Sequence, residues 1–196
     1  MATPPIILVV NPGSTSTKLA IAQGDAITAN ETLRHSADEL RRFGRLWDQF
    51  ETRLQFAYTW ARARLTDCSA VVGIGGLLRP MKAGTYRVNE RMLADARANL
   101  QGEHASNFGC ALAHALGAAF HCPAFTVDPV SVNEFEPLAA YSGHPAITRS
   151  SLSHALNIHA AARRAAAAAH LPYDRSSFIV AHLGGGISVA PVRNGA

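Results

Sequence analysis

The sequence predicts an α/β layered domain, and two observations indicate it. Short apolar runs bounded by glycine or proline turns alternate along the chain with longer stretches whose apolar residues recur at helical spacing. In addition, a strand–turn–strand pattern with a glycine turn occurs near each end of the chain. With 196 residues and a hydrophobic content of 48%, the chain has enough apolar side chains for a core.

The first strand–turn–strand pattern runs from Pro5 to Ala22. Its apolar residues 6–10 are typical of a buried strand, and Asn11-Pro12-Gly13 is a turn signal. The hydroxyl side chains of residues 14–17 and the ammonium group of Lys18 follow. With freed backbone N–H groups, such donors hold phosphate oxygens. Residues 19–22 indicate a second strand, whereas a Walker loop or a dinucleotide fingerprint opens a helix. We therefore predict a hairpin that binds phosphate.

The second pattern lies at residues 178–190. Strands are expected over 178–181 and 187–190, on either side of the glycine turn at residues 182–186. Consecutive glycines let the backbone approach a ligand closely because no Cβ is in the way. Two loops of the same design favour two related half-domains that face one nucleotide.

The remaining elements are predicted from periodicity and turn signals. Two or three strands are expected over residues 5–33, and further strands over 70–74 and 124–127; helices are expected over 38–65, 89–100, 105–120 and 151–170. The apolar residues of the first helix fall near one face: Leu46, Phe50, Leu54, Ala57, Ala61 and Leu65.

The last of these helices marks a change of domain. Ser150 or Ser151 is its expected N-cap. It is expected to lead from a first domain, residues 1–150, into an incomplete second domain, residues 151–196. One helix and one hairpin cannot bury their own faces. We therefore expect either that a partner covers them or that the sequence is a fragment.

Composition excludes several classes of protein. The formal net charge is +4 and the pI about 9.3, but the basic residues are scattered, so nucleic-acid binding is not expected. The three cysteines form no C-x-x-C pair and are expected to be reduced, mostly buried thiols. We expect no signal peptide and no membrane span, and therefore a cytoplasmic location.

Several polar residues stand where predicted strands and helices begin or end, which is where α/β sites lie. They are His104, Asp128, His154 and His182. The histidines lack the spacing of a zinc site, and no G-x-S-x-G elbow of a hydrolase is present. Oxygen-rich phosphate and Mg²⁺ chemistry fits the residue types better. The other histidines considered, His121, His144, His159 and His170, have no such setting and are expected to be structural or on the surface.

Together these motifs resemble the acetate/butyrate (short-chain carboxylate) kinase family of the actin-like sugar-kinase superfamily. The matching stretches are spread over the whole chain in the family's order: Leu8–Lys18, Val72–Gly73 with Gly75–Leu78, Gly84–Asn89, Gln101–Asn107, Val127–Val130, His154–Asn157 and Ala181–Val189. The Asn-Pro-Gly-Ser-Thr-Ser-Thr-Lys and Gly-Glu-His-Ala-Ser-Asn forms indicate the butyrate branch. Sugar kinases and actin-like ATPases share the phosphate hairpins but not the second of these motifs.

The resemblance implies a fold and a reaction. The fold is an actin-like ATPase (ribonuclease H-like) domain with a mixed sheet and flanking helices, plus the start of a second similar domain. In the reaction, ATP and a short-chain carboxylate give ADP and an acyl phosphate, or the reverse. Members of the family are homo-oligomers, and no nucleic-acid or membrane partner is expected.

The resemblance also implies roles for individual residues. The first phosphate loop would contain Asn11, Ser14, Ser16 and Lys18, and the second His182, Gly184, Gly185 and Gly186. Asp128 would lie near Mg²⁺ and the transferred group. His104 and His154 would donate hydrogen bonds to the phosphoryl oxygens in the transition state. A carboxylate nucleophile needs no base, so positioning and charge neutralisation are the main tasks.

The chain departs from the family pattern in two ways. The family usually has an arginine in Val-Gly-Arg-Gly-Gly, where this chain has Ile74. An aliphatic side chain cannot neutralise an anion, and Arg79 is the arginine nearby in sequence. In addition, the chain covers roughly the N-terminal half of the family's length. The alternative to an active kinase is therefore a catalytically incomplete remnant that binds phosphate or a partner.

Overall fold

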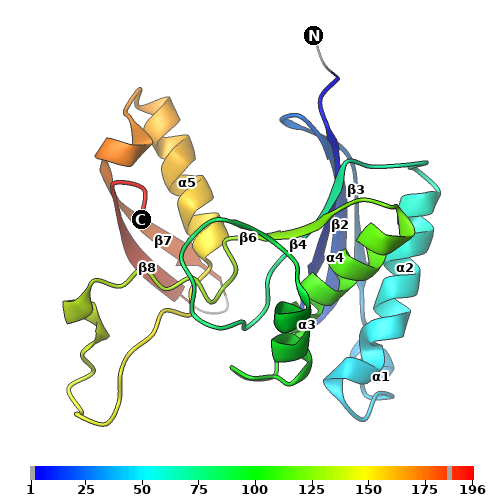
Figure 1. The fold of residues 1–196 in the computed structure, drawn as a ribbon, viewed down its shortest axis with the longest axis horizontal. Helices are drawn as coiled ribbons and strands as arrows, with labels where there is room; N and C mark the ends of the chain where they lie inside the picture. Colours follow the sequence, from blue (N-terminus) through cyan, green and yellow to red (C-terminus); the bar gives the residue numbers. More distant parts are fainter. Residues whose placement is uncertain (1–2, 185–186) are drawn as a thin grey trace. The chain divides into compact units, whose positions relative to one another are not determined.

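A computed structural model of the chain describes residues 3–184 and 187–196 and divides into two compact units (Figure 1). The first unit extends to Arg79 and resumes at Thr85–Val127. The second consists of Pro80–Gly84 and Asp128–Ala196. The expected domain boundary near residue 150 remains a prediction.

The first unit is built on a six-stranded mixed sheet with the strand order β3-β2-β1-β4-β6-β5. The strands are β1 (Ile6–Pro12), β2 (Ser16–Gln23), β3 (Ala26–Arg34), β4 (Ala70–Gly73), β5 (Thr85–Arg87) and β6 (Ala124–Val127). The first three form an antiparallel meander, β1, β4 and β6 are parallel, and β5 closes the edge antiparallel to β6. The expected α/β fold with a mixed sheet and flanking helices is confirmed.

The helices of the first unit are α1 (Ala37–Leu40), α2 (Phe50–Arg62), α3 (Glu90–Arg97) and α4 (Phe108–Ala119). Figure 1 shows α2 and α4 side by side, and α4 also contacts β4 and β6. As its composition predicts, α4 is largely buried. It approaches the sheet closely because Gly73 of β4 and Gly109 of α4 face each other: a Cβ on Gly73 would lie 2.1 Å from the carbonyl oxygen of Gly109.

The single helix expected over residues 38–65 is wrong, because α1 and α2 are separate. After α1 the chain unwinds at residues 42–45, and a 3-10 turn, Leu46–Gln49, leads into α2. A local hydrogen bond explains the new start. The carboxylate of Asp48 accepts from the backbone N–H of Arg45 at 2.9 Å, so it satisfies a donor at the beginning of a new helical segment.

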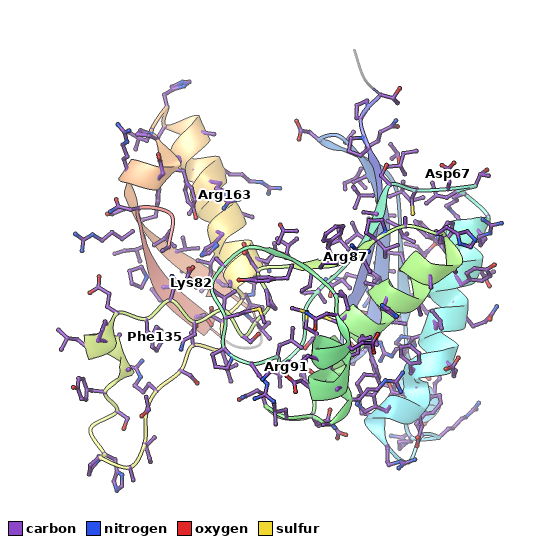
Figure 2. The ribbon with its side chains drawn as sticks, in the orientation of Figure 1. Asp67, Lys82, Arg87, Arg91, Phe135 and Arg163 are labelled. Carbon is purple, nitrogen blue, oxygen red and sulfur yellow. The ribbon has the colours of Figure 1, made fainter. Side chains whose placement is uncertain are left out.

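The second unit contains α5 (Ala155–Ala168) and the antiparallel hairpin of β7 (Ser177–Leu183) and β8 (Ile187–Arg193). The 3-10 turns Pro137–Ala140 and Tyr173–Arg175 complete it. Its small core consists of Ile158, Ala162 and Val192, with partly buried residues packed against them: Tyr173, Phe178, Val180 and Ala190. The guanidinium of Arg163, labelled in Figure 2, lies over the Tyr173 ring, 5.0 Å from its centre.

In this unit the structure agrees with one sequence expectation and contradicts another. One face of the hairpin is uncovered within it, with Ile179 82% and Ile187 72% exposed, as expected for a hairpin and a single helix. The N-cap prediction is wrong: α5 begins after His154, not after Ser150 or Ser151. The backbone N–H of Ser153 donates to the carbonyl of Val130, which holds this segment outside the helix.

The cysteines are free thiols, of which Cys110 is buried, while Cys68 and Cys122 are half-buried with their sulfur atoms 3.5 Å apart. Burial raises the pKa of the Cys110 thiol to about 11.

The helices in the described residues all fall short of the length and apolar character that a membrane span requires.

Candidate functional site

The first predicted phosphate loop is the turn between β1 and β2. Asn11 and Lys18 are directly opposite each other in the antiparallel register, so their side chains share one face of the hairpin. Between them, the backbone N–H of Gly13 donates to the carbonyl of Ser16 at 2.7 Å and closes the turn. Ser14 and Lys18 are exposed and Ser16 is half-buried. The structure therefore brings together all the predicted residues of this loop.

A buried arginine that the sequence analysis missed lies behind this turn. Arg53 of α2 is 1% exposed, and its guanidinium donates to the carbonyls of Gly13 and Ser16 at 3.0 and 3.3 Å. Burial lowers the pKa of Arg53 below its usual value. The sequence contained a signal for this burial. Arg53 lies three residues after Phe50 and four before Ala57, so it is a charged residue on the helix face that was expected to be apolar.

The motif Gly-Glu-His-Ala-Ser-Asn places His104 at an exposed position before α4. Its Nδ1 accepts from the backbone N–H of Ser106 at 3.1 Å and lies 2.8 Å from the Ser106 hydroxyl oxygen. An acceptor at Nδ1 places the proton of a neutral imidazole on Nε2. His104 can therefore donate a hydrogen bond from Nε2.

Asn107 of the same motif has a structural task. Its side chain is fully buried; the carbonyl oxygen accepts from the N–H of Leu77 at 2.8 Å, and the amide group donates to the carbonyl of Gly102 at 2.9 Å. It also donates to Asn99. Asn107 thus joins the loop at Leu77 to the loop at Gly102, which precedes His104.

Asp128, in the second unit, is held from both sides. Its backbone N–H donates to the carbonyl of Gly84, and its Oδ1 accepts from the N–H of Gly84 at 2.7 Å. Its Oδ2 lies 3.2 Å from Nδ1 of His159. The residue is 6% exposed and adopts the left-handed region, with φ of 39°, which L-residues rarely do.

His159 was expected to be structural or on the surface, and the structure shows it as a buried residue in contact with Asp128. It is 5% exposed on α5 and bonded to Asp128, and its Nε2 is 3.8 Å from a carboxylate oxygen of Glu134. Because an ionised carboxylate only accepts, the bond to Asp128 assigns a proton to Nδ1 of His159. No local pattern marks this contact, since it joins residues 31 positions apart.

The structure brings His154 and His182 together. Their rings stack with centres 4.0 Å apart and planes inclined by 17°. His154 is the N-cap of α5, and His182 lies near the end of β7. Gly184 follows at an exposed bend, while Gly185 and Gly186 lie outside the described residues.

Ile74 stands directly after β4, where its backbone N–H donates to the carbonyl of Val10. Its side chain is half-buried. Arg79 is engaged elsewhere: its guanidinium donates to both oxygens of Asp95, at 2.7 and 3.1 Å. This hydrogen-bonded pair lowers the pKa of the Asp95 carboxyl and raises that of Arg79.

Comparison with known proteins agrees with the motifs. No family model matches the sequence. The chain is 47% identical over 197 residues to a probable butyrate kinase of Listeria welshimeri and 45% identical over 192 residues to butyrate kinase 2 of Clostridium acetobutylicum. Each comparison covers 96% of this chain and 54% of the relative. The chain therefore spans about half the length of the curated relatives that it matches.

Solved structures show the same fold. The acetate kinase of Porphyromonas gingivalis is similar with a TM-score of 0.70 and 16% identity, over 97% of this chain and 55% of that one. A propionate kinase of Francisella tularensis gives a TM-score of 0.61 at 17% identity, over 97% and 55% respectively. Both the actin-like ATPase fold and the resemblance inferred from the motifs are thus confirmed: over almost its whole length, the chain is similar in sequence to butyrate kinases and in fold to an acetate kinase.

Proposed function

We propose that this chain carries phosphate-binding and catalytic residues of a short-chain carboxylate kinase. In the reaction, a carboxylate oxygen attacks the γ-phosphorus of ATP, the bond to the β-phosphate oxygen breaks, and ADP leaves while an acyl phosphate forms. The observation that carries the proposal is the β1–β2 turn, which gathers Asn11, Ser14, Ser16 and Lys18 in one hairpin. The names of the relatives, butyrate kinases, support the same reaction.

In the first unit, the hairpin supplies the donors for phosphate oxygens. Exposed hydroxyl and ammonium groups fit these oxygens, which carry charge that must be offset when two anions meet. His104 would donate from Nε2 to an oxygen of the transferred group, because Ser106 occupies Nδ1. Preorganised donors of this kind stabilise the charge of a phosphoryl-transfer transition state.

In the second unit, Asp128 is the candidate ligand for Mg²⁺. Its Oδ1 accepts from the N–H of Gly84 and its Oδ2 lies against Nδ1 of His159. A carboxylate oxygen has two lone pairs, so one that accepts a hydrogen bond can also bind a metal. Among the described residues no cluster of three or more His, Cys, Asp or Glu side chains could hold a metal ion. A single carboxylate fits Mg²⁺, which usually keeps waters and binds phosphate oxygens. Bound with ATP, Mg²⁺ would neutralise charge on the phosphates.

The stacked histidines are further candidates for phosphoryl contacts. His154 would donate to the transferred group, and His182 would belong to the second phosphate loop with Gly184, Gly185 and Gly186. The stack limits rotation of both rings, so their nitrogen atoms keep fixed directions.

A second candidate function is a remnant that binds phosphate without turnover. The observation that favours it is Ile74, which replaces the arginine of the family pattern, together with the commitment of Arg79 to Asp95. Loss of one charged donor of this kind costs roughly 100-fold or more in rate.

The partners follow from the proposed reaction. They are a short-chain carboxylate, or the acyl phosphate in the reverse direction, and further copies of the chain as in the family. We place the protein in the cytoplasm, where ATP and carboxylates are available, without nucleic-acid or membrane partners.

The test is acyl-hydroxamate formation from butyrate and MgATP by this chain, with circular dichroism as a check of folding. We expect hydroxamate above background, and its loss in His154→Ala. A folded chain that binds phosphate but forms no hydroxamate would replace the kinase by the remnant. A folded chain that neither binds phosphate nor forms product would overturn both.

A further inference from the structure

In the described part of the chain, the buried guanidinium of Arg53 donates hydrogen bonds only to uncharged oxygen atoms. It donates to the carbonyls of Gly13 and Ser16, to the hydroxyl of Thr17 at 2.9 Å and to the side-chain oxygen of Gln49 at 2.9 Å. A longer contact of 3.4 Å reaches the carbonyl of Ser14. No ion pair among the described residues involves this guanidinium, although Glu39 acts on it at longer range.

Such a buried cation is costly for the fold. Removing a guanidinium from water is unfavourable unless good hydrogen bonds and a counter-charge offset the lost hydration. Here the hydrogen bonds are present, and the Phe108 ring lies 5.2 Å from the guanidinium carbon. Among the described residues, no carboxylate forms an ion pair with this guanidinium. An anion bound at the turn would complete the arrangement.

The contacts also determine which way the turn's peptide groups point. In a trans peptide the C=O and the N–H of the same unit point in opposite directions, and the described residues contain no cis peptide. The carbonyls of Gly13 and Ser14 point toward Arg53. The N–H groups of Ser14 and Thr15 therefore point away from it, toward the outer side of the turn. Successive N–H groups on one side of a turn form an anion site.

A second buried contact fixes the same end of the hairpin. The hydroxyl of Thr17 lies 3.0 Å from Nε2 of His35, and the backbone N–H of His35 donates to the carbonyl of Thr15 at 2.8 Å. The turn is thus fixed from behind by Arg53 and from the side by His35. Its outer surface, with Ser14 and Thr15, stays exposed.

We propose that Arg53 is a positioning residue for the first phosphate loop: its planar guanidinium fork holds the carbonyls of Gly13, Ser14 and Ser16 so that the Ser14 and Thr15 N–H groups face a phosphate oxygen. The inference rests on the proposed function, because it presumes that this turn binds phosphate. The charge of Arg53 adds long-range attraction for the anion, while the fork sets the geometry. Lysine would keep the charge but not the fork.

The test is a titration of this chain with inorganic phosphate, followed by the backbone amide signals of residues 13–18 in NMR. The variants are Arg53→Lys and Arg53→Gln, and the control is Arg62→Gln, an exposed arginine of the same helix. We expect the Kd for phosphate to rise about tenfold or more in Arg53→Gln and at least about threefold in Arg53→Lys, with the Ser14 and Thr15 signals changing most. Arg62→Gln is expected to bind like the wild type.

The outcomes separate the inference from the function on which it rests. If the wild type shows no shifts at residues 13–18, the phosphate loop itself is wrong. If the wild type binds and both Arg53 variants bind equally well, the positioning role is wrong. Should Arg53→Gln fail to fold, Arg53→Lys and Gln49→Met decide, because Gln49→Met removes one anchor of the guanidinium and leaves the turn intact; wild-type affinity in both would overturn the inference.

Discussion

His154 and His182 stack their imidazole rings, with centres 4.0 Å apart and planes inclined by 17°. The contact joins the N-cap of α5 to the end of β7. The two residues belong to separate sequence motifs. From the sequence they are two independent candidates for phosphoryl contacts, and the structure shows that their rings are in contact.

The stack allows ring packing and hydrogen bonding to be separated by mutation. His154→Phe keeps an aromatic ring for His182 but removes the nitrogen donors, whereas His154→Ala removes both. We expect both variants to lower the rate of hydroxamate formation about 100-fold, and Phe to preserve the melting temperature better than Ala. If His154→Phe retained the wild-type rate, the donor role of His154 would be wrong.

Ile74→Arg is expected to raise kcat/KM for hydroxamate formation, on the order of 100-fold, because it restores a charged donor after β4. The half-buried position of Ile74 leaves room for a long side chain to reach water. Ile74→Met serves as the control of similar length without charge. Equal rates for the two variants would show that a cation at this position does not assist the reaction.

Because His35 is buried, we expect the free energy of unfolding to fall in mild acid. Burial, followed by the nearby charge of Arg53, lowers the pKa of His35 in the folded state. The unfolded chain therefore binds a proton more readily, so this residue's contribution falls as the pH drops below about 6.5. Urea unfolding at pH 7.5 and pH 5.5 should show a smaller pH effect in His35→Gln than in the wild type. The exposed His121→Gln is the control, and an unchanged pH effect in His35→Gln would refute the assignment.

Asn107→Ala is expected to lower the free energy of unfolding by about 2–4 kcal/mol, because it leaves the Leu77 N–H and the Gly102 carbonyl without their buried partner. The exposed Asn30→Ala on β3 should change it by less than about 0.5 kcal/mol. Urea unfolding monitored by tryptophan fluorescence measures both. Similar values for the two variants would mean that Asn107 is not a structural residue.

Gly73→Ala should destabilise the first unit by at least about 3 kcal/mol, since its Cβ would overlap the Gly109 carbonyl and push α4 from the sheet. Gly44→Ala is the matched control, because its Cβ would meet nothing closer than 3.7 Å. Thermal unfolding of the two variants checks the difference. A Gly73→Ala variant as stable as Gly44→Ala would rule out close packing of α4 on β4.

The elements that local patterns specify could be predicted from the sequence. The apolar runs define β1, β4 and β6, and the Asn-Pro-Gly turn predicts the β1–β2 hairpin. Its residues Asn11, Ser14, Ser16 and Lys18 lie together because they are neighbours along the chain. The spread of motifs also predicted the similarity to butyrate kinases, because many short matches in one order are more specific than any single loop.

Tertiary structure alone decided the contacts between distant segments. It placed Arg53 behind the first turn, His159 against Asp128 and His154 against His182. It also divided the helix expected over residues 38–65 into α1 and α2, and it placed the start of α5 at Ala155, after His154. The physical reason is that a side chain's hydrogen bonds and burial depend on whatever the fold brings beside it, whereas periodicity and turn signals act over a few neighbouring residues.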